Sequence, residues 1–392
     1  MDCGKNSKER ILLKRLWKIC SYILVAVLSA SIALSLAGNN RAYPKLEELK
    51  SVIDRYFVDT VDHAAVEDAA AAAIVEALGD RWSYYMTAEE YKAYQEKMAN
   101  AYVGIGITIM QQEDGYIAVI KVEPSGPAAE AGLLPGDVIK AVAGQDIASL
   151  DMEQIKSMVK GNEGTKVKLQ LLRGEEILEK EVERRTIQSI VAKGQMLSDG
   201  IGLVTIANFD SRCAKETIAA IEQLQQQCAR ALIFDVRFNP GGYKKELIEI
   251  LDYLLPEGPL FRSVNYDGKE KIDRSDENCL QIPMAVLING DTYSAAEFFG
   301  AALSEYGVAK LVGQPTIGKG HYQTSFKLSD GSAAVISIGK YCTPNGVSLS
   351  DVGLTPDVLI EVDAETYESI YVGMLNPEDD PQVQAAIAVL SE

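Results

Sequence analysis

The chain has 392 residues, which is enough for two or three domains with a sizeable core. Its 38 Lys and Arg residues against 56 Asp and Glu residues give a net charge of −18. This balance argues against a nucleic-acid partner, because a phosphate-binding surface needs clustered positive charge, and it predicts an acidic, solvated exterior.

The amino-terminal segment, residues 1–38, predicts export across a membrane. Basic side chains precede an uncharged apolar run over residues 19–37, which at about 1.5 Å per residue reaches roughly 28 Å, close to the hydrocarbon thickness of a bilayer. The positive-inside rule then predicts a single-pass protein of the cell membrane, with a cytoplasmic basic segment and most of the chain outside the cytoplasm. Residues 35–37 also fit a signal-peptide cleavage site, which would make the protein secreted, but the length of the run favours an uncleaved anchor.

Residues 39–100 predict a helical region. Apolar side chains recur at three- and four-residue spacing over residues 46–56, and an alanine-rich stretch follows over residues 64–78. Thr87 with Glu90 has the pattern of a capped helix start. A lead-in packed on the main body and a dimerisation arm both fit this pattern, so a homodimer remains open.

The cysteines do not indicate a metal site. Four of the six lie in the predicted exported part, at Cys213, Cys228, Cys279 and Cys342, and none has a metal-ligand spacing. Buried thiols or an occasional disulfide are expected, since a chain with a large core does not depend on crosslinks. We expect no metal and no cofactor.

Residues 101–187 predict short alternating strands separated by glycines, with two short helices between them. The expected strands cover residues 103–110, 116–122, 137–142 and 166–172. The expected helices cover residues 127–132, where a proline opens the first turn and a glycine follows the end, and residues 151–160.

Two segments of this region resemble a PDZ domain, namely residues 102–106 (Tyr-Val-Gly-Ile-Gly) and residues 125–139. The resemblance implies a β-sandwich-like domain inserted before the core. It also implies a loop whose backbone N–H groups bind the terminal carboxylate of a peptide, while the following strand pairs with that peptide. The loop residues are Val103, Gly104, Ile105 and Gly106. The alternative is that these glycines only shape a turn.

Residues 188–375 predict an α/β core, followed by a helical tail over residues 376–392. Expected strands and helices alternate along the chain, which implies a mostly parallel sheet covered on both faces. The strands are expected over residues 201–207, 231–236 and 283–288, and the helices over residues 213–227 and 244–255. The fold class is therefore a multidomain mixture of α/β and α+β parts, preceded by a transmembrane helix and a helical lead-in.

Ser294 opens an apolar helical run after the third of these strands. Ser294 and Glu297 fit a capping box, which explains a serine here without any chemistry. A serine at a strand-to-helix turn is also held at the edge of a sheet, where the next backbone N–H can face a developing oxyanion. The Ser-x-x-Lys signature of penicillin-binding proteins is absent, which disfavours that class.

Lys319 follows Ser294 by 25 residues and lies between Gly318 and Gly320. A lone lysine is ordinarily a surface residue. Glycines on both sides, however, let the backbone approach another strand closely and deliver the side chain into a crowded site. A desolvated lysine has a lowered pKa, so its neutral amine can accept the proton of a serine hydroxyl.

The chain has only two histidines, His63 and His321, so a serine nucleophile has few alternative bases. His321 is the competing base, and strand alternation does not exclude it. Gln323 is able to orient the lysine amine by hydrogen bonding without adding charge. Residues 235–242 (Asp-Val-Arg-Phe-Asn-Pro-Gly-Gly) end in a turn rich in backbone N–H groups, which fits an oxyanion hole as well as an ordinary turn.

Taken together, these segments resemble the carboxyl-terminal processing peptidases, which are tail-specific Ser/Lys proteases with a PDZ domain. The resemblance covers nearly everything from residue 43 onward. Its motifs occur in the family's order at residues 234–242, 294–297, 318–323, 328–331, 341–346 and 353–357.

The resemblance implies a serine endopeptidase that needs no cofactor and whose PDZ domain captures apolar carboxyl ends of protein substrates. Ser294 would be the nucleophile, Lys319 the general base and Gln323 the residue that positions the lysine. The oxyanion donors would be the N–H of Ala295 and one from Gly241 or Gly242. Two departures leave the subsite shape open, namely Thr292-Tyr293 before the serine and Phe298-Phe299 after it. The alternative function is a catalytically inactive PDZ scaffold that binds exported proteins at the membrane.

Overall fold

The computed structural model describes residue 17 and residues 43–391. The predicted transmembrane run lies outside these residues. Within the described part of the chain, no helix is both long and apolar enough to cross a bilayer. The chain forms two units that divide between Ala70 and Ala71.

The first unit contains α2 (Pro44–Tyr56) and the beginning of α3 (His63–Glu76). Pro44 occupies the first turn of α2, where its missing N–H leaves no hydrogen bond unmade. The predicted apolar positions Leu46, Leu49 and Val52 are exposed along this helix. The two helices α2 and α3 confirm the helices that the sequence predicts over these stretches.

After the rest of α3, the second unit contains a strand that the helical prediction for residues 39–100 missed. Tyr84–Met86 form β1, which pairs antiparallel with β18 (Ala333–Cys342). Three residues are too few to show a strand periodicity, and the partner strand lies far along the chain. The helix start at Thr87 is confirmed: the Glu90 N–H donates to Thr87 Oγ1 at the beginning of α4 (Ala88–Met98).

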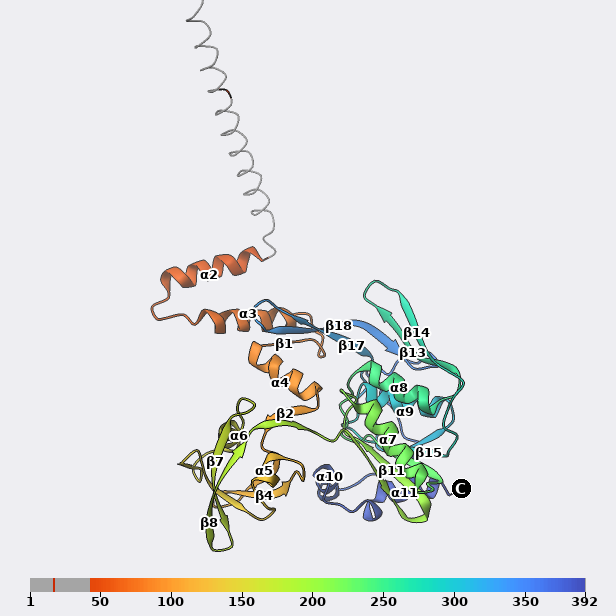
Figure 1. Ribbon diagram of the computed structural model, residues 1–392. Helices are drawn as coiled ribbons and strands as arrows, with labels where there is room; N and C mark the ends of the chain where they lie inside the picture. Colours follow the sequence, from red (N-terminus) through yellow and green to blue (C-terminus); the bar gives the residue numbers. More distant parts are fainter. Residues whose placement is uncertain (1–16, 18–42, 392) are drawn as a thin grey trace, which may run out of the picture. The chain divides into compact units, whose positions relative to one another are not determined.

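Within residues 101–187, the strands between Ile107 and Glu183 form an antiparallel sheet with its own buried core (Figure 1). Its strand order is β3-β4-β5-β7-β8, with β6 paired to β5, and β3 lies at one edge. The elements are β3 (Ile107–Gln111), β4 (Ile117–Val122), α5 (Pro127–Glu130), β5 (Val138–Val142), β6 (Gln145–Asp146), α6 (Met152–Val159), β7 (Lys166–Arg173) and β8 (Glu176–Glu183).

The prediction of one strand over residues 103–110 was wrong. Ala101–Gly104 form β2, which pairs with β9 (Arg185–Gln188), and β3 begins only at Ile107. Between them Ile105 is buried in the core of residues 101–187, and Gly106 has a φ of 78°, which breaks the extended conformation. The loop therefore separates two strands that belong to different sheets.

The predicted mostly parallel sheet of the core is confirmed. Its order is β10-β11-β12-β15-β16-β19, and all neighbours are parallel except β10 with β11. The strands are β10 (Ala192–Met196), β11 (Ile201–Ile206), β12 (Ala231–Asp235), β15 (Met284–Ile288), β16 (Ala309–Gly313) and β19 (Val358–Leu359).

Helices cover both faces of this sheet, as the alternation predicted (Figure 1). Alternate residues such as Val204 and Phe234 belong to a core shared with α7 (Cys213–Gln226), α8 (Lys244–Leu254) and α9 (Ala295–Glu305). Their neighbours, such as Leu203 and Ile233, pack instead with Val383 and Ala386 of α11 (Pro381–Val389). The carboxyl-terminal helix is thus part of the core.

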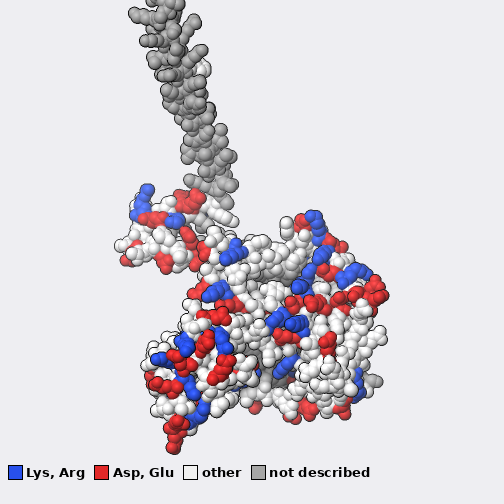
Figure 2. All heavy atoms as spheres, in the orientation of Figure 1, with Lys and Arg blue, Asp and Glu red and all other residues white. Residues whose placement is uncertain are grey.

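A second sheet of the core has the order β1-β18-β13-β14, with β17 also paired to β18. The remaining elements are β13 (Gly258–Asn265), β14 (Glu270–Ser275), β17 (His321–Lys327) and α10 (Ala364–Tyr371). On the face drawn in Figure 2, basic side chains are interspersed with acidic ones.

Candidate active site

Ser294 lies at the amino-terminal end of α9, in the turn that follows β15. Its backbone has φ 61° and ψ −123°, a conformation that non-glycine residues rarely adopt. Thr292 fixes the turn, because its Oγ1 accepts from the Asn289 N–H at 3.0 Å and donates to the Val236 carbonyl at 2.9 Å. The turn is therefore held in a strained conformation by buried hydrogen bonds.

Glu297 joins the serine turn to the lysine segment. Its side chain is completely buried, and its carboxylate accepts from the Ser294 N–H at 2.9 Å, which is one half of the predicted capping box. The same carboxylate accepts from the N–H groups of Gly318 at 2.6 Å and Lys319 at 3.0 Å, and from Thr316 Oγ1 at 2.5 Å. One acceptor thus fixes two segments that are distant in sequence.

The Lys319 amine is shielded from solvent. Burial lowers its pKa to about 8, although the charges of Asp80 and Glu297 act in the opposite direction. The Tyr341 hydroxyl donates to the Lys319 carbonyl. Burial raises the pKa of that tyrosine despite a hydrogen bond with the Ser294 side chain. Tyr341 therefore contacts both segments.

The glycines around Lys319 permit the close backbone approach that the sequence predicted. A Cβ on Gly318 would lie 2.8 Å from the backbone nitrogens of Val352 and Gly353, and one on Gly320 would lie 2.7 Å from Ser350 Cβ. The neighbour is the loop after β18 rather than a strand, which corrects the expected partner.

Trp82 and Asp80 belong to the site, although sequence reasoning treated their segment as a break between helices. The Lys319 Nζ lies 4.8 Å from the centre of the Trp82 ring, which also stacks on Tyr293 at 6.2 Å. Asp80 accepts from the Trp82 N–H and from Ser83 Oγ, at 3.1 and 2.6 Å. No local signal marks these residues, because only the pairing of β1 with β18 brings them to the lysine.

Gln323 and His321 occupy different surroundings. Gln323 Nε2 donates to Ser337 Oγ at 3.0 Å and to the His321 carbonyl at 3.2 Å, and in the described part of the chain its amide has no hydrogen bond to the Lys319 amine. A bulge between Tyr322 and Gln323 interrupts the pairing of β17 with β18. Gln323 lines the cavity described below, whereas His321 is not among the described residues that line it.

The turn after β12 approaches the serine closely. A Cβ on Gly241 would lie 2.8 Å from both Ser294 Cβ and the Ala295 nitrogen, so this position needs glycine. The Gly241 N–H donates to Asn239 Oδ1 at 2.9 Å. Among the described residues, the N–H groups of Gly242 and Ala295 have no hydrogen-bond partner. The sequence predicted either Gly241 or Gly242 as the second oxyanion donor. Of these two, only the Gly242 N–H is free to donate to an oxyanion in the described part of the chain.

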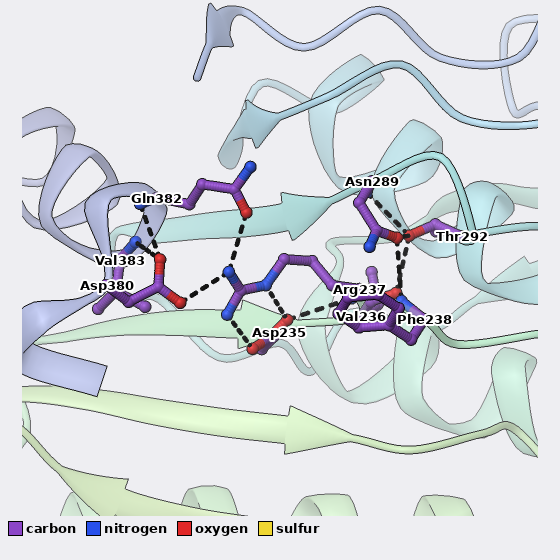
Figure 3. A network of polar contacts seen from close by, with 9 residues as sticks. All are labelled: Asp235, Val236, Arg237, Phe238, Asn289, Thr292, Asp380, Gln382 and Val383. Atoms are coloured by element: carbon purple, nitrogen blue, oxygen red, sulfur yellow. Dashed lines mark hydrogen bonds and ion pairs between the residues drawn. The ribbon is translucent and has the colours of Figure 1, made fainter. Parts of the chain in front are cut away.

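A buried ion cluster involves Asp235 and Arg237, which precede this turn in the chain (Figure 3). Arg237 pairs with both carboxylate oxygens of Asp235, at 2.9 and 2.7 Å, and with Asp380 at 2.8 Å. Asp380 also accepts from the Gln382 N–H at the first turn of α11, and Gln382 Oε1 accepts from Arg237 at 2.9 Å. The cluster connects α11 to the strand end that carries the glycine turn.

These elements enclose one cavity of about 1230 Å³. It is lined by every residue that the sequence predicted for catalysis and oxyanion binding, namely Ser294, Lys319, Gln323, Ala295, Gly241 and Gly242. Of the two departures from the family pattern, Tyr293 and Phe298 line the cavity as well, whereas Phe299 packs in the core against Phe209 and Phe234.

The predicted peptide-binding residues lie apart from this cavity lining. Val103 and Gly104 are in β2, Ile105 is buried, and Gly106 precedes the edge strand β3. An edge strand has backbone groups available for pairing with another chain.

The fold and the comparisons with known proteins define a serine-type protease with a PDZ domain. Residues 200–360 match Peptidase family S41, and residues 103–183 match the PDZ domain. The chain is 30% identical to the carboxy-terminal processing protease CtpA of Bacillus subtilis over 89% of its own length and 78% of that protein. It therefore belongs to the carboxy-terminal processing proteases of family S41.

Two further comparisons agree. A CtpA-like serine protease of Staphylococcus haemolyticus is 29% identical, over 94% of this chain and 76% of that protein. The crystal structure of an S41-type protein from Bacteroides fragilis shares the fold with a TM-score of 0.53 at 17% identity, over 82% of this chain and 90% of that one.

Proposed function

We propose that this chain is an exported, membrane-anchored endopeptidase in which Ser294 is the nucleophile and Lys319 the general base. The observation that supports this most directly is the lowered pKa of the Lys319 amine, in a segment tied to Ser294 through Glu297. A neutral amine is available at a mildly alkaline pH, so it can accept the serine proton.

In this mechanism Ser294 Oγ attacks the substrate carbonyl as its proton moves to Lys319 Nζ. The N–H groups of Ala295 and Gly242 stabilise the oxyanion. Lys319 then gives the proton to the leaving amine, and an acyl-enzyme remains on Ser294. Water, deprotonated by the same amine, hydrolyses the ester. Gln323, which lines the same cavity, would position Lys319.

The PDZ domain supplies substrate recognition in this proposal. Backbone N–H groups around Val103–Gly106 would bind a carboxylate, and the substrate would add a strand along β3, the edge of its sheet. Apolar carboxyl ends are the expected ligands, and peptide binding is expected to activate the protease. Deletion of residues 102–186 tests this activation. Undiminished turnover with an unchanged preference for carboxyl ends would contradict it.

The membrane anchor rests on the apolar run of residues 19–37. We expect the full chain to remain with membranes after an alkaline carbonate wash and residues 39–392 to stay in solution. Recovery of a shortened chain in the soluble fraction would indicate a cleaved signal.

The catalytic roles are tested with residues 39–392 and peptides that have apolar carboxyl ends. Ser294→Ala and Lys319→Ala should abolish turnover, and retained turnover in either would refute the pairing. Loss of turnover in His321→Ala with an intact fold would favour a histidine base.

A serine-directed phosphonylating probe separates a protease from an inactive PDZ scaffold. The protease should be labelled at Ser294, and Lys319→Ala should prevent the labelling. A folded protein that binds peptides but takes no label would be the scaffold.

A further inference from the structure

Asp210 is a buried carboxyl group in the cavity that the proposed mechanism does not use. It follows β11, is 3% exposed and lines the same cavity as Ser294. Its Oδ1 has no hydrogen-bond partner in the described part of the chain. Leaving a buried carboxylate without a partner is costly, so the group calls for an explanation beyond packing.

Asp210 lies close to the proposed oxyanion turn. A Cβ on Gly242 would lie 2.6 Å from Asp210 Oδ1, and a Cβ on the adjacent Gly241 would lie 2.8 Å from Ser294 Cβ. An extended peptide lengthens by about 3.3 to 3.6 Å with each residue. A substrate side chain that reaches Asp210 therefore belongs to a residue within about two positions of the scissile bond.

The charges around Asp210 leave it without a close cation. Burial raises its pKa to about 7, which Lys97 opposes and Glu246 reinforces. Lys97 is exposed, and among the described residues neither it nor any other cation is a hydrogen-bond partner of Asp210 Oδ1. Tyr94, Tyr243 and Tyr293 line the same cavity, and burial raises the pKa of each of their hydroxyls, with the charge of Asp210 adding to the effect.

We propose that Asp210 forms the acidic end of a substrate subsite that binds a Lys or Arg side chain near the scissile bond. The cation would pair with the unpartnered carboxylate, and the tyrosine rings would cover its alkyl stem. An uncharged side chain of equal length would leave the carboxylate unpaired, so discrimination should be strong. The inference rests on the proposed endopeptidase function and names a class of its substrates.

The test uses the full chain with a saturating short peptide that has a free apolar carboxyl end, which occupies the PDZ domain, and substrate peptides with amidated carboxyl ends, which the PDZ domain should not capture. Lys or norleucine is placed in turn at the two residues on either side of the scissile bond. At one position we expect kcat/KM to be about tenfold or more higher for Lys. In Asp210→Asn and Asp210→Ser this ratio should fall to about one. Asp199→Asn, which removes one charge just before β11, should keep it.

A binding experiment makes the subsite testable without turnover. The Ser294→Ala variant, with and without Asp210→Asn, is titrated with fluorescently labelled versions of the same Lys and norleucine peptides. A preference for the Lys peptides that disappears with Asp210→Asn supports the subsite, whether or not any peptide is cleaved. If no peptide is cleaved and no probe labels Ser294, only the proposed mechanism fails. Equal binding and equal hydrolysis of the Lys and norleucine peptides at every position would overturn the inference while leaving the protease intact.

Discussion

Lys319 owes both its position and its lowered pKa to its surroundings. Its backbone is held by Glu297 and its amine lies beside the Trp82 ring, so both its position and its protonation come from neighbours distant in sequence. Desolvation is the main cause of its lowered pKa. Changes to these neighbours should therefore alter the pH dependence of the reaction.

Trp82→Ala should shift the pH profile of kcat/KM. Opening the site to water lets the Lys319 pKa rise from about 8 toward its ordinary 10.5. The rise of kcat/KM with pH should then occur about one unit higher, with roughly a fivefold loss at pH 8 and roughly a tenfold loss well below pH 8. Trp82→Phe, which keeps an aromatic ring beside the lysine, should retain part of the lowered Lys319 pKa and so show a smaller displacement of the pH profile. A uniform loss at every pH, with an unchanged midpoint, would show that Trp82 has only a structural role.

Lys319→Met should stabilise the folded protein near neutral pH. The folded-state pKa of about 8 lies below the unfolded value of 10.5, so burial penalises the ammonium form. The penalty is complete below about pH 8 and disappears as the pH passes 10.5. We expect a gain of about 2 kcal/mol in the free energy of unfolding at pH 7 that fades toward pH 10.5. Urea unfolding measures it, with the exposed Lys327→Met as the control.

Several residues of the site could be predicted because their signals are local. Ser294 opens a helix after a strand, Lys319 lies between two glycines, and both line the cavity. Trp82 and Asp210 could not be predicted, because a turn residue and a loop aspartate acquire their surroundings only through tertiary pairing. Burial without a partner cannot be inferred from one sequence.

At the level of elements, the glycine turn depends on the carboxyl-terminal helix. Asp380 caps α11 and pairs with Arg237, which directly precedes the turn containing Gly241 (Figure 3). The predicted helical tail is thus a support for the site. A buried ion pair that loses one partner leaves an uncompensated charge.

Asp380→Ala should destabilise the protein by about 3 to 5 kcal/mol. It should also lower kcat, because the turn that holds Gly242 loses its support. Thermal or urea unfolding measures the first effect and peptide hydrolysis the second. Glu378→Gln is the matched control, since Glu378 is exposed and two residues away. Equal stability of the two variants would contradict the role of the cluster.

At the level of the whole molecule, the parallel sheet was predictable and some boundaries were not. Continuous apolar runs between helices identified β11, β12 and β15. The division of residues 103–110 between β2 and β3 depends on the buried Ile105 and the positive φ of Gly106, which a pattern of alternating residues does not reveal.

Gly106→Val should separate substrate capture from chemistry. Gly106 has a φ of 78°, which a β-branched residue adopts only with strain, so the loop before β3 should lose its shape. We expect weaker binding of peptides with free apolar carboxyl ends by fluorescence polarisation, with labelling of Ser294 by a phosphonylating probe retained. Unchanged binding would place carboxylate recognition elsewhere.

The single carboxylate of Glu297 has a consequence for how the site opens. It accepts from the amides of Ser294, Gly318 and Lys319, so releasing either segment exposes a buried charge and breaks the hydrogen bonds of the other. We therefore expect these three amides to exchange with deuterium in one cooperative opening. Nucleophile and base would then appear together during folding and disappear together, without a populated form that has only one of them in place.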